Sequence, residues 1–145
     1  MTFNMNGIRS ATDKGFFDWM SKQKADVVCV QEVRAMLDQI PEVARTPKGY
    51  VAHFHLAEQK GYSGVGIYSR ETPDRIVTSL DWPDWDSEGR FIRADFGKLS
   101  VTSIYMPSGS SGEERQARKF AAMERLVPIL AKMRRERREH ILCGD

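Results

Sequence analysis

Three apolar, β-branched segments that end in polar groups limit the possible fold more than any other feature of this chain. They are residues 25–32, 101–107 and 141–145, and their polar groups are Glu32, Tyr105 and Asp145. Such runs are typical of buried strands, and strands whose polar ends converge build a rigid site. We therefore expect a sheet whose strand ends form a catalytic or binding centre. Because the last segment carries its acid as the final residue, we expect that centre to be cut through the middle.

Length and composition are those of a globular protein with one core. The chain has 145 residues, of which 41% are hydrophobic and 29% charged, and this is sufficient for a single domain. No apolar stretch is long enough to span a membrane, and the first residues do not form a signal peptide. We therefore expect a soluble, cytoplasmic protein that has no membrane partner.

Net charge and cysteine content give only weak indications of function. The net charge is +2, and the basic run 132–138 is typical of a solvated helix end, so charge alone does not indicate nucleic acid. Cys29 and Cys143 both lie inside apolar strand segments. We expect them to be buried and reduced rather than to form a disulfide or a metal pair.

Hydrophobic periodicity predicts helices and strands in an α/β order with a mixed sheet. The predicted strands are 1–5, 25–32, 50–55, 63–69, 75–80, 91–96, 99–105 and 140–144, and the predicted helices are 10–22, 35–44 and 113–138. Ser10 is expected to cap the first helix and Pro128 to kink the last. The last helix is expected to bury one apolar face, which comprises Phe120, Met123, Val127, Leu130 and Met133. One sheet with helices on a single side would leave its other face bare, so we expect something outside the chain to cover it.

Glu32 is the strongest candidate for a functional side chain. It follows four apolar residues of a strand, 27–30, and one glutamine, where a carboxylate is poorly solvated and needs a partner. One possible partner is a hard divalent cation such as Mg²⁺, which prefers one or two carboxylates together with water and phosphate oxygens. The other possibility is a basic side chain in an ion pair at the strand end.

Neutral polar groups lie at two further strand ends. Asn4 and Asn6 flank the exit of the first strand into Gly7. They either form only a turn, or their amides orient a carboxylate or a phosphate. Tyr105 precedes the turn at 106–109, and its side chain is either packed or donates its hydroxyl to a phosphate oxygen.

Asp145 and the histidines complete the set of candidates. Asp145 follows Gly144, which permits a close approach of the backbone, although this pattern is weak by itself. His53 and His55 are two residues apart on a predicted strand and so share a face. A zinc pair at these positions would need ligands that the sequence does not offer nearby.

Six motifs occur together in an order that is typical of one family. They are 3–9 (FNMNGIR), 28–32 (VCVQE), 61–66 (GYSGVG), 88–90 (EGR), 105–109 (YMPSG) and 142–145 (LCGD). Over essentially the whole chain they resemble the exonuclease III family of apurinic/apyrimidinic (AP) endonucleases, within the endonuclease/exonuclease/phosphatase superfamily, and bacterial members most closely. The resemblance implies that residues 1–145 form an incomplete domain. This would be the amino-terminal half of a four-layered α/β sandwich, with two facing mixed sheets flanked by helices.

The resemblance also implies roles for individual residues. Glu32 would bind Mg²⁺, or Mn²⁺ in its place, with Asn4 and Asn6 beside the ion. Asn4 would also belong to the catalytic cluster, in which Tyr105 hydrogen-bonds the scissile phosphate. Asp145 would activate the attacking water or serve the leaving group. Contacts to the DNA backbone would come from Arg9, Lys14 and Tyr62.

The activity implied by the resemblance is metal-assisted hydrolysis of the phosphodiester 5′ to an abasic site, with 3′→5′ exodeoxyribonuclease activity as a second possibility. The partner would be double-stranded DNA with abasic or 3′-blocked sites, and no obligate protein partner is expected beyond the missing carboxy-terminal half. The family's later asparagine and Asp-His pair do not occur in this sequence, so we expect the chain alone to be inactive. Two alternatives stay open, namely another phosphoesterase of the superfamily and a non-catalytic half that binds DNA.

Overall fold

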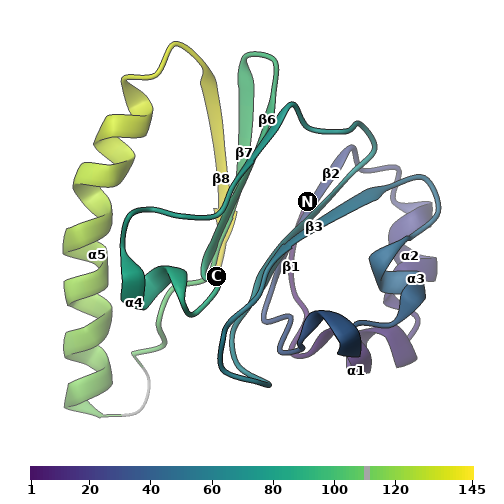
Figure 1. Ribbon diagram of the computed structural model, residues 1–145, viewed down its shortest axis with the longest axis horizontal. Helices are drawn as coiled ribbons and strands as arrows, with labels where there is room; N and C mark the ends of the chain where they lie inside the picture. The colour runs from purple at the N-terminus through teal and green to yellow at the C-terminus, as the bar shows by residue number, and fades with distance from the viewer. Residues whose placement is uncertain (110–111) are drawn as a thin grey trace.

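The computed structural model describes residues 1–109 and 112–145 and arranges them in four layers, in the order helix, sheet, sheet and helix (Figure 1). Sheet A has the strand order β1-β2-β4-β3 and consists of β1 (Thr2–Asn4), β2 (Val27–Gln31), β4 (Val65–Ser69) and β3 (Val51–His55). Sheet B has the order β5-β6-β7-β8 and consists of β5 (Arg75–Val77), β6 (Phe91–Phe96), β7 (Leu99–Ile104) and β8 (Glu139–Gly144).

Helices cover the outer face of each sheet. The helices beside sheet A are α1 (Ile8–Asp13), α2 (Phe16–Lys22) and α3 (Glu42–Arg45), and those beside sheet B are α4 (Pro83–Asp86) and α5 (Glu113–Arg134) (Figure 1). A short 3₁₀ helix, Leu37–Gln39, precedes α3. None of the helices in the described part of the chain combines the length and apolar character needed to cross a bilayer.

The two sheets face one another across an apolar interior that the chain supplies by itself. Side chains alternate along β2, so that Val28 and Val30 pack toward the helices while Cys29 packs toward sheet B. The predicted pair of facing mixed sheets is therefore confirmed. The expectation of a single sheet with one bare face is wrong, because Ile92 and Val101 of sheet B cover the inner face of sheet A.

A buried polar contact holds the two sheets in register near one end of the sandwich. Gln31 is 1% exposed, and its Nε2 donates to Ser103 Oγ over 2.9 Å, while Ser103 Oγ donates to the Val30 carbonyl over 3.1 Å. Buried polar groups that are fully paired favour one relative placement of their elements. Gln31 is the last residue of β2 and Ser103 is one residue before the end of β7, so the contact fixes how those ends face each other.

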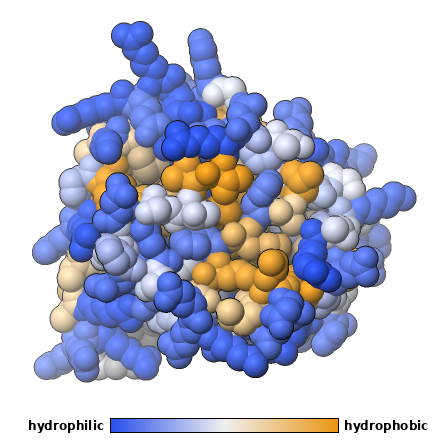
Figure 2. Space-filling model, in the orientation of Figure 1, coloured by the Kyte–Doolittle hydropathy of each residue, from blue (hydrophilic) through white to orange (hydrophobic). Residues whose placement is uncertain are grey.

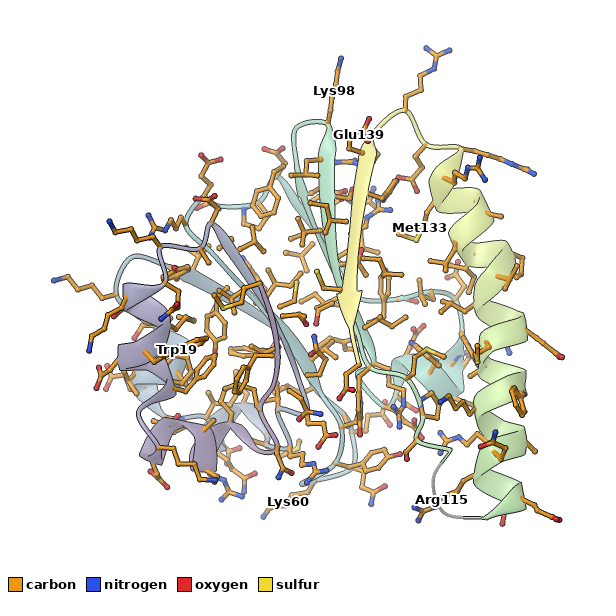
Figure 3. All side chains as sticks on the ribbon, turned by 180° about the vertical axis from the view of Figure 1, so that it is seen from behind. Trp19, Lys60, Lys98, Arg115, Met133 and Glu139 are labelled. Atoms are coloured by element: carbon orange, nitrogen blue, oxygen red, sulfur yellow. The ribbon has the colours of Figure 1, made fainter. Side chains whose placement is uncertain are left out.

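Both sheets are mixed, and the parallel pairs decide which strand ends meet. β1 runs parallel to β2, with Asn4 opposite Gln31, and β7 runs parallel to β8, with Ile104 opposite Gly144. The carboxyl ends of parallel neighbours lie at the same edge of their sheet. In Figure 3, Lys98 and Glu139 mark the other end of sheet B, far from Lys60 and Arg115.

The first predicted helix is two helices in the structure. Gly15 has φ +80°, a left-handed conformation that ends α1 and begins α2. Ser10 therefore lies inside α1 rather than capping it, and the amino end of α1 has no side-chain cap. The apolar residues Phe16, Phe17 and Met20 are buried on α2 as expected.

The long helix α5 buries only part of the predicted face, namely Met133 and, in part, Leu130. Its buried residues are Ala122, Leu126 and Met133, and Met133 points toward sheet B (Figure 3). Phe120 is 53% exposed and Val127 is 65% exposed, so the helix is rotated relative to the expectation from large apolar residues. The small Ala122 lies against Trp85 and Phe91 in a shared cluster, which allows a close approach of helix and sheet.

Other elements differ from the prediction in length or were not predicted. The helix expected over 35–44 is replaced by the 3₁₀ turn and α3, which begins directly after Pro41. α4 was not predicted from the sequence. The Asp86 carboxylate accepts hydrogen bonds from Ser79 and from the backbone of Leu80 and Trp82, and these bonds close the loop around α4.

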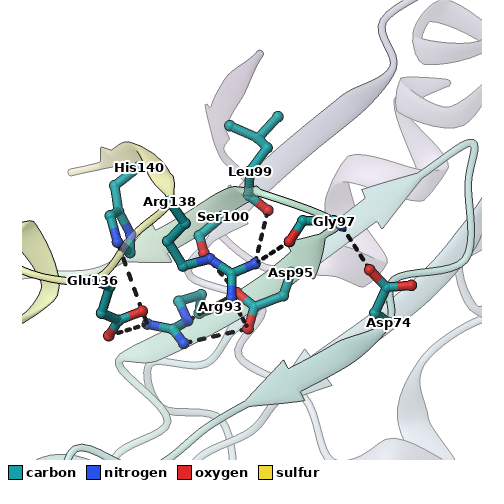
Figure 4. A network of polar contacts seen from close by, with 9 residues as sticks. All are labelled: Asp74, Arg93, Asp95, Gly97, Leu99, Ser100, Glu136, Arg138 and His140. Carbon is teal, nitrogen blue, oxygen red and sulfur yellow. Dashed lines mark hydrogen bonds and ion pairs between the residues drawn. The ribbon is translucent and has the colours of Figure 1, made fainter.

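A network of charged side chains joins the carboxyl end of α5 to sheet B (Figure 4). Arg93 and Asp95 of β6 are buried, and Arg93 pairs with Glu136 while Asp95 pairs with Arg138. His140 Nε2 lies 3.8 Å from a Glu136 oxygen.

On the surface shown in Figure 2, apolar residues gather toward the middle of the face and hydrophilic ones surround them.

Candidate active site

Four strand ends from both sheets meet at one place. Asn4 is the last residue of β1, Glu32 follows β2, Tyr105 follows β7 and Asp145 follows β8. The parallel pairs β1–β2 and β7–β8 place these ends on the same edge of each sheet, and the Gln31–Ser103 contact sets the edges face to face. The structure thus brings together four of the predicted site residues.

The Asn4 amide is the central contact of this cluster. Its Nδ2 donates to Glu32 Oε1 over 2.9 Å and also donates to Asp145 Oδ2. Its Oδ1 accepts the backbone N–H of Asn6 over 2.9 Å. A neutral donor between two carboxylates holds them close without adding a charge, so Asn4 links an acid of sheet A to an acid of sheet B.

Glu32 is 9% exposed and carries an ion pair with Arg34. Arg34 Nη2 lies 2.5 Å from Glu32 Oε2, and Arg34 Nη1 donates to Asn6 Oδ1 over 2.7 Å. The sequence left a basic partner open as one possibility for Glu32, and this partner is present. Arg34 itself was missed, although a basic residue two positions after the acid was a usable signal.

The backbone around Glu32 is strained and held in place by neighbours. Glu32 has φ +54° and Arg34 has φ +49°, which non-glycine residues rarely adopt. The Arg34 N–H donates to the Ser63 carbonyl over 2.8 Å, and the Val33 N–H donates to Gly64 over 3.0 Å. These bonds fix the direction of both charged side chains.

Tyr105 is half-buried, and its hydroxyl hydrogen-bonds Glu32. Burial first, and then the hydrogen bond and negative charge of Glu32, raise the pKa of Tyr105 to about 12, against the opposing charges of Arg90 and Arg34. The phenol therefore stays protonated near neutral pH. It can donate a hydrogen bond, but it is not available as a phenolate nucleophile.

A cavity of about 550 Å³ opens in front of these groups, and its lining includes residues that sequence reasoning missed. Glu32, Tyr105 and Asp145 lie on one side, and Gln116 and Lys119 of α5 lie on the other. Gln116 and Lys119 are three positions apart on the amino-terminal part of the helix and so share a face. Lys119 brings a positive charge to a cavity whose other charged groups are carboxylates.

The three predicted DNA contacts lie in different surroundings. Arg9 is exposed on α1, and Lys14 at the end of α1 is exposed beside Asn4 and Asn6, where these three residues line a second hollow of about 470 Å³. Tyr62 is half-buried, and its hydroxyl accepts a hydrogen bond from Arg90 Nη2 over 2.8 Å. Lys14 is therefore the predicted contact that shares a hollow with the amide groups of the site.

The histidine spacing does not form a metal site. His55 Nδ1 lies 2.7 Å from the Phe91 carbonyl, and burial lowers the pKa of His53 below its ordinary value. Within residues 1–109 and 112–145 no group of three or more His, Cys, Asp and Glu side chains is arranged to hold a metal. Cys29 and Cys143 are free thiols; Cys29 is buried as expected, whereas Cys143 is only partly buried.

The chain is similar to nucleases along its whole length. It is 29% identical over 146 residues to an exodeoxyribonuclease of Bacillus subtilis, which covers 100% of this chain and 56% of that protein. The structure of an AP endonuclease from Archaeoglobus fulgidus superposes with a TM-score of 0.85 at 33% identity, over 99% of this chain and 55% of that one. A 3′-5′ exonuclease of Neisseria meningitidis gives 0.76 at 26% identity, over 99% and 56%.

The chain thus spans about half the length of these relatives. Within that half, the superposed elements are the ones that carry the four converging strand ends. Residues 1–145 also match the sequence profile of the Endonuclease/Exonuclease/phosphatase family. Sequence, fold and the arrangement of strand ends agree, and the chain therefore belongs to the endonuclease/exonuclease/phosphatase family.

Proposed function

We propose that this chain supplies part of the active site of a DNA repair nuclease that hydrolyses the phosphodiester 5′ to abasic sites, with 3′→5′ exodeoxyribonuclease activity as a second reaction. Residues 1–145 would be the amino-terminal part of one incomplete domain. The observation that carries the proposal is the link that Asn4 makes between Glu32 and Asp145 at the ends of strands from both sheets. Relatives named as an AP endonuclease and an exodeoxyribonuclease support the substrate and the reaction.

A divalent metal fits the groups around Glu32. The Arg34 guanidinium bonds Glu32 Oε2 and Asn6 Oδ1, so a positive charge is already accommodated between a carboxylate and an amide oxygen. Oxygen ligands of this kind are preferred by Mg²⁺ and accepted by Mn²⁺. We assign Glu32, Asn4 and Asn6 to this site. When bound, the metal would neutralise negative charge on the scissile phosphate.

Tyr105, Asn4 and Asp145 act on the scissile phosphate and on the proton that is transferred during hydrolysis. When substrate binds, the protonated Tyr105 hydroxyl turns its one proton from Glu32 to a phosphate oxygen, and the Asn4 amide holds the Asp145 carboxylate toward the reacting atoms. Asp145 either accepts the proton of the attacking water or serves the oxygen of the leaving group. Fixed donors aimed at the developing charge lower the barrier, because they need no reorganisation during the reaction.

Binding of double-stranded DNA would depend on its backbone. We assign phosphate or sugar contacts to Arg9, Lys14 and Tyr62, and of these Lys14 lies beside Asn4 and Asn6. Contacts of this type position the duplex without reading its sequence. Selection of an abasic or 3′-blocked site would then come from the ease with which such a nucleotide leaves the stack.

Two other functions are compatible with the fold. Another phosphoesterase of the family would use the same acids and amides on a different substrate. A non-catalytic half that only binds DNA is favoured by one observation, namely that the chain spans about 55% of the archaeal AP endonuclease. These possibilities differ in whether the chain binds a metal at Glu32 and whether it distinguishes abasic DNA.

The test measures metal and DNA binding on the 145-residue chain itself. Mn²⁺ affinity from electron paramagnetic resonance should fall in Glu32→Gln and stay unchanged in Glu42→Gln, which makes the same chemical change on exposed α3. In fluorescence anisotropy, a duplex with one tetrahydrofuran abasic analogue should bind more tightly than the intact duplex when Mn²⁺ is present. Equal Mn²⁺ affinity in the two variants would refute the metal site, and equal affinity for the two duplexes would refute the substrate.

A further inference from the structure

Arg90 is a buried cation with no part in the chemistry proposed above. It is 3% exposed and stands directly before β6, in the segment Glu88-Gly89-Arg90. Moving a guanidinium out of water costs free energy unless its donors are paired. Its partners therefore indicate which part of the molecule the charge supports.

Each side of the Arg90 guanidinium has its own partner. Nε pairs with Glu88 Oε2 at 2.5 Å, Nη1 donates to the Tyr105 carbonyl over 2.9 Å, and Nη2 donates to the Tyr62 hydroxyl over 2.8 Å. The backbone adds a fourth contact, because the Tyr105 N–H donates to the Arg90 carbonyl over 2.9 Å. Tyr105 is thus bound to Arg90 through both its N–H and its C=O.

The same guanidinium also lies against aromatic rings. Its central carbon is 4.8 Å from the ring centroid of Tyr105, 5.6 Å from that of Tyr62 and 6.0 Å from that of Trp85. A cation within about 6 Å of an aromatic ring is attracted by the ring, and more strongly where water is excluded. The closest of the three rings belongs to the residue whose hydroxyl bonds Glu32.

Neighbouring elements fix Arg90 in turn. Glu88 also binds Arg118 of α5 at 2.5 Å. Burial alone would raise the pKa of Glu88, but the hydrogen bonds and charges of Arg90 and Arg118 hold it below its ordinary value. Gly89 has φ +58°, and a Cβ there would lie 2.6 Å from the His55 carbonyl oxygen, so the turn that delivers Arg90 requires glycine.

We propose that Arg90 is a positioning residue for Tyr105, whose ring it fixes so that the hydroxyl is held beside Glu32 and faces the cavity. The importance of Tyr105 rests on the proposed function, but its orientation can be measured without any activity. Lysine should not replace Arg90, because an ammonium group cannot bond Glu88, Tyr62 and a carbonyl in one plane.

The test follows the tyrosines by ¹⁹F NMR in a chain labelled with 3-fluorotyrosine. The chain has four tyrosines, and their signals are assigned by single Tyr→Phe variants. Arg90→Met and Arg90→Lys should each shift and broaden the signal of Tyr105, with a smaller shift at Tyr62. The signal of Tyr68, which lies in the core between sheet A and its helices, should not move.

The matched control is Arg93→Met, which removes another buried arginine from the adjoining strand. Arg93 pairs with Asp95 and Glu136 in the network of Figure 4, and within the described residues none of its hydrogen bonds or ion pairs reaches Tyr105. The Tyr105 signal should therefore keep its position and width in this variant. An equal response to Arg90→Met and Arg93→Met would show that any lost buried charge disturbs Tyr105, and would overturn the proposal.

An unchanged Tyr105 signal in folded Arg90→Met would also overturn it. If that variant does not fold, Arg90→Lys and Tyr62→Phe decide the question. Both weaken the contacts that fix the side chain at position 90 while keeping its positive charge. Absence of a Tyr105 shift in both would then contradict the proposal. All of these spectra are recorded without metal, so failure of the proposed metal site leaves their outcome unchanged.

Discussion

Glu32 and Arg34 form a charge pair at the proposed metal site. The guanidinium bonds Glu32 Oε2 and Asn6 Oδ1, the oxygens that we assign to the metal. We expect Arg34→Met to raise Mn²⁺ affinity about fivefold, because one nearby positive charge in a solvated position costs about 1 kcal/mol. Isothermal titration calorimetry gives the affinity, with exposed Arg45→Met as the control. A weaker affinity in Arg34→Met would mean that Arg34 supports the ligands instead of competing with the ion.

Glu88 should make stability depend on acid pH. Its folded-state pKa lies below the ordinary value of 4.5, since the hydrogen bonds from Arg90 and Arg118 outweigh the effect of burial. A depressed carboxyl pKa contributes stability that is present above pH 4.5 and is lost as pH falls through the folded-state value. Urea unfolding should therefore show a smaller loss between pH 6 and pH 3 in Glu88→Gln than in the parent chain. The exposed Glu124→Gln should keep the parent's pH dependence, and equal slopes in all three chains would contradict the role of Glu88.

Much of the site could be predicted at the scale of single residues, and the rest depended on long-range packing. Asn4, Glu32, Tyr105 and Asp145 each lie at the end of a strand, which is a local signal, and the structure brings all four together. Arg34, two positions after Glu32, was missed despite a local signal, but Arg90 and the pair Gln116 and Lys119 could not be assigned in the same way. Their positions follow from how loops and α5 fold back on the sheets, and no short pattern in the sequence encodes that arrangement. The catalytic, metal-binding and DNA-binding roles of these residues are still predictions.

Among the elements, strands were predicted better than helix faces. β2 lies within the predicted strand 25–32, although it is shorter, and β6 and β7 pair across the two-residue gap that the sequence left between strands 91–96 and 99–105. The predicted buried face of α5 was wrong for Phe120, Met123 and Val127, which are exposed, because every large apolar side chain was taken to point inward. Contact with Trp85 and Phe91 instead favours Ala122, whose small side chain lets the helix approach.

Pro128 should reduce the stability of α5. It lies inside the helix at an exposed position, where it lacks an N–H for the preceding turn and crowds its carbonyl. We expect Pro128→Ala to raise the free energy of unfolding by about 2 kcal/mol, since about 3 kcal/mol of helix cost is partly offset by the greater freedom of the unfolded chain. Urea denaturation measures the change. A lower stability in Pro128→Ala would show that the proline shapes α5 to fit sheet B.

At the scale of the whole molecule, one open side of the sandwich is the edge formed by β1 and β8. β1 ends the order of sheet A and β8 ends that of sheet B, the two strands contact each other, and within the described residues neither has a second neighbour in its sheet. Large apolar side chains are exposed along this edge, with Phe3 at 40%, Ile141 at 49% and Leu142 at 44%. Unpaired edges with apolar side chains are prone to associate with other strands.

We therefore expect the chain to self-associate through this edge as its concentration rises. Sedimentation velocity should show a concentration-dependent increase in mass, and Leu142→Lys should reduce it, because a lysine on an edge strand opposes pairing. The control is Val127→Lys, which places the same charge on an equally apolar and more exposed position of α5, 65% exposed, away from the edge. If Val127→Lys reduced association as much as Leu142→Lys, general surface hydrophobicity would be the cause. A chain that stayed monomeric at every concentration would show that β1 and β8 are protected by their own twist and shortness.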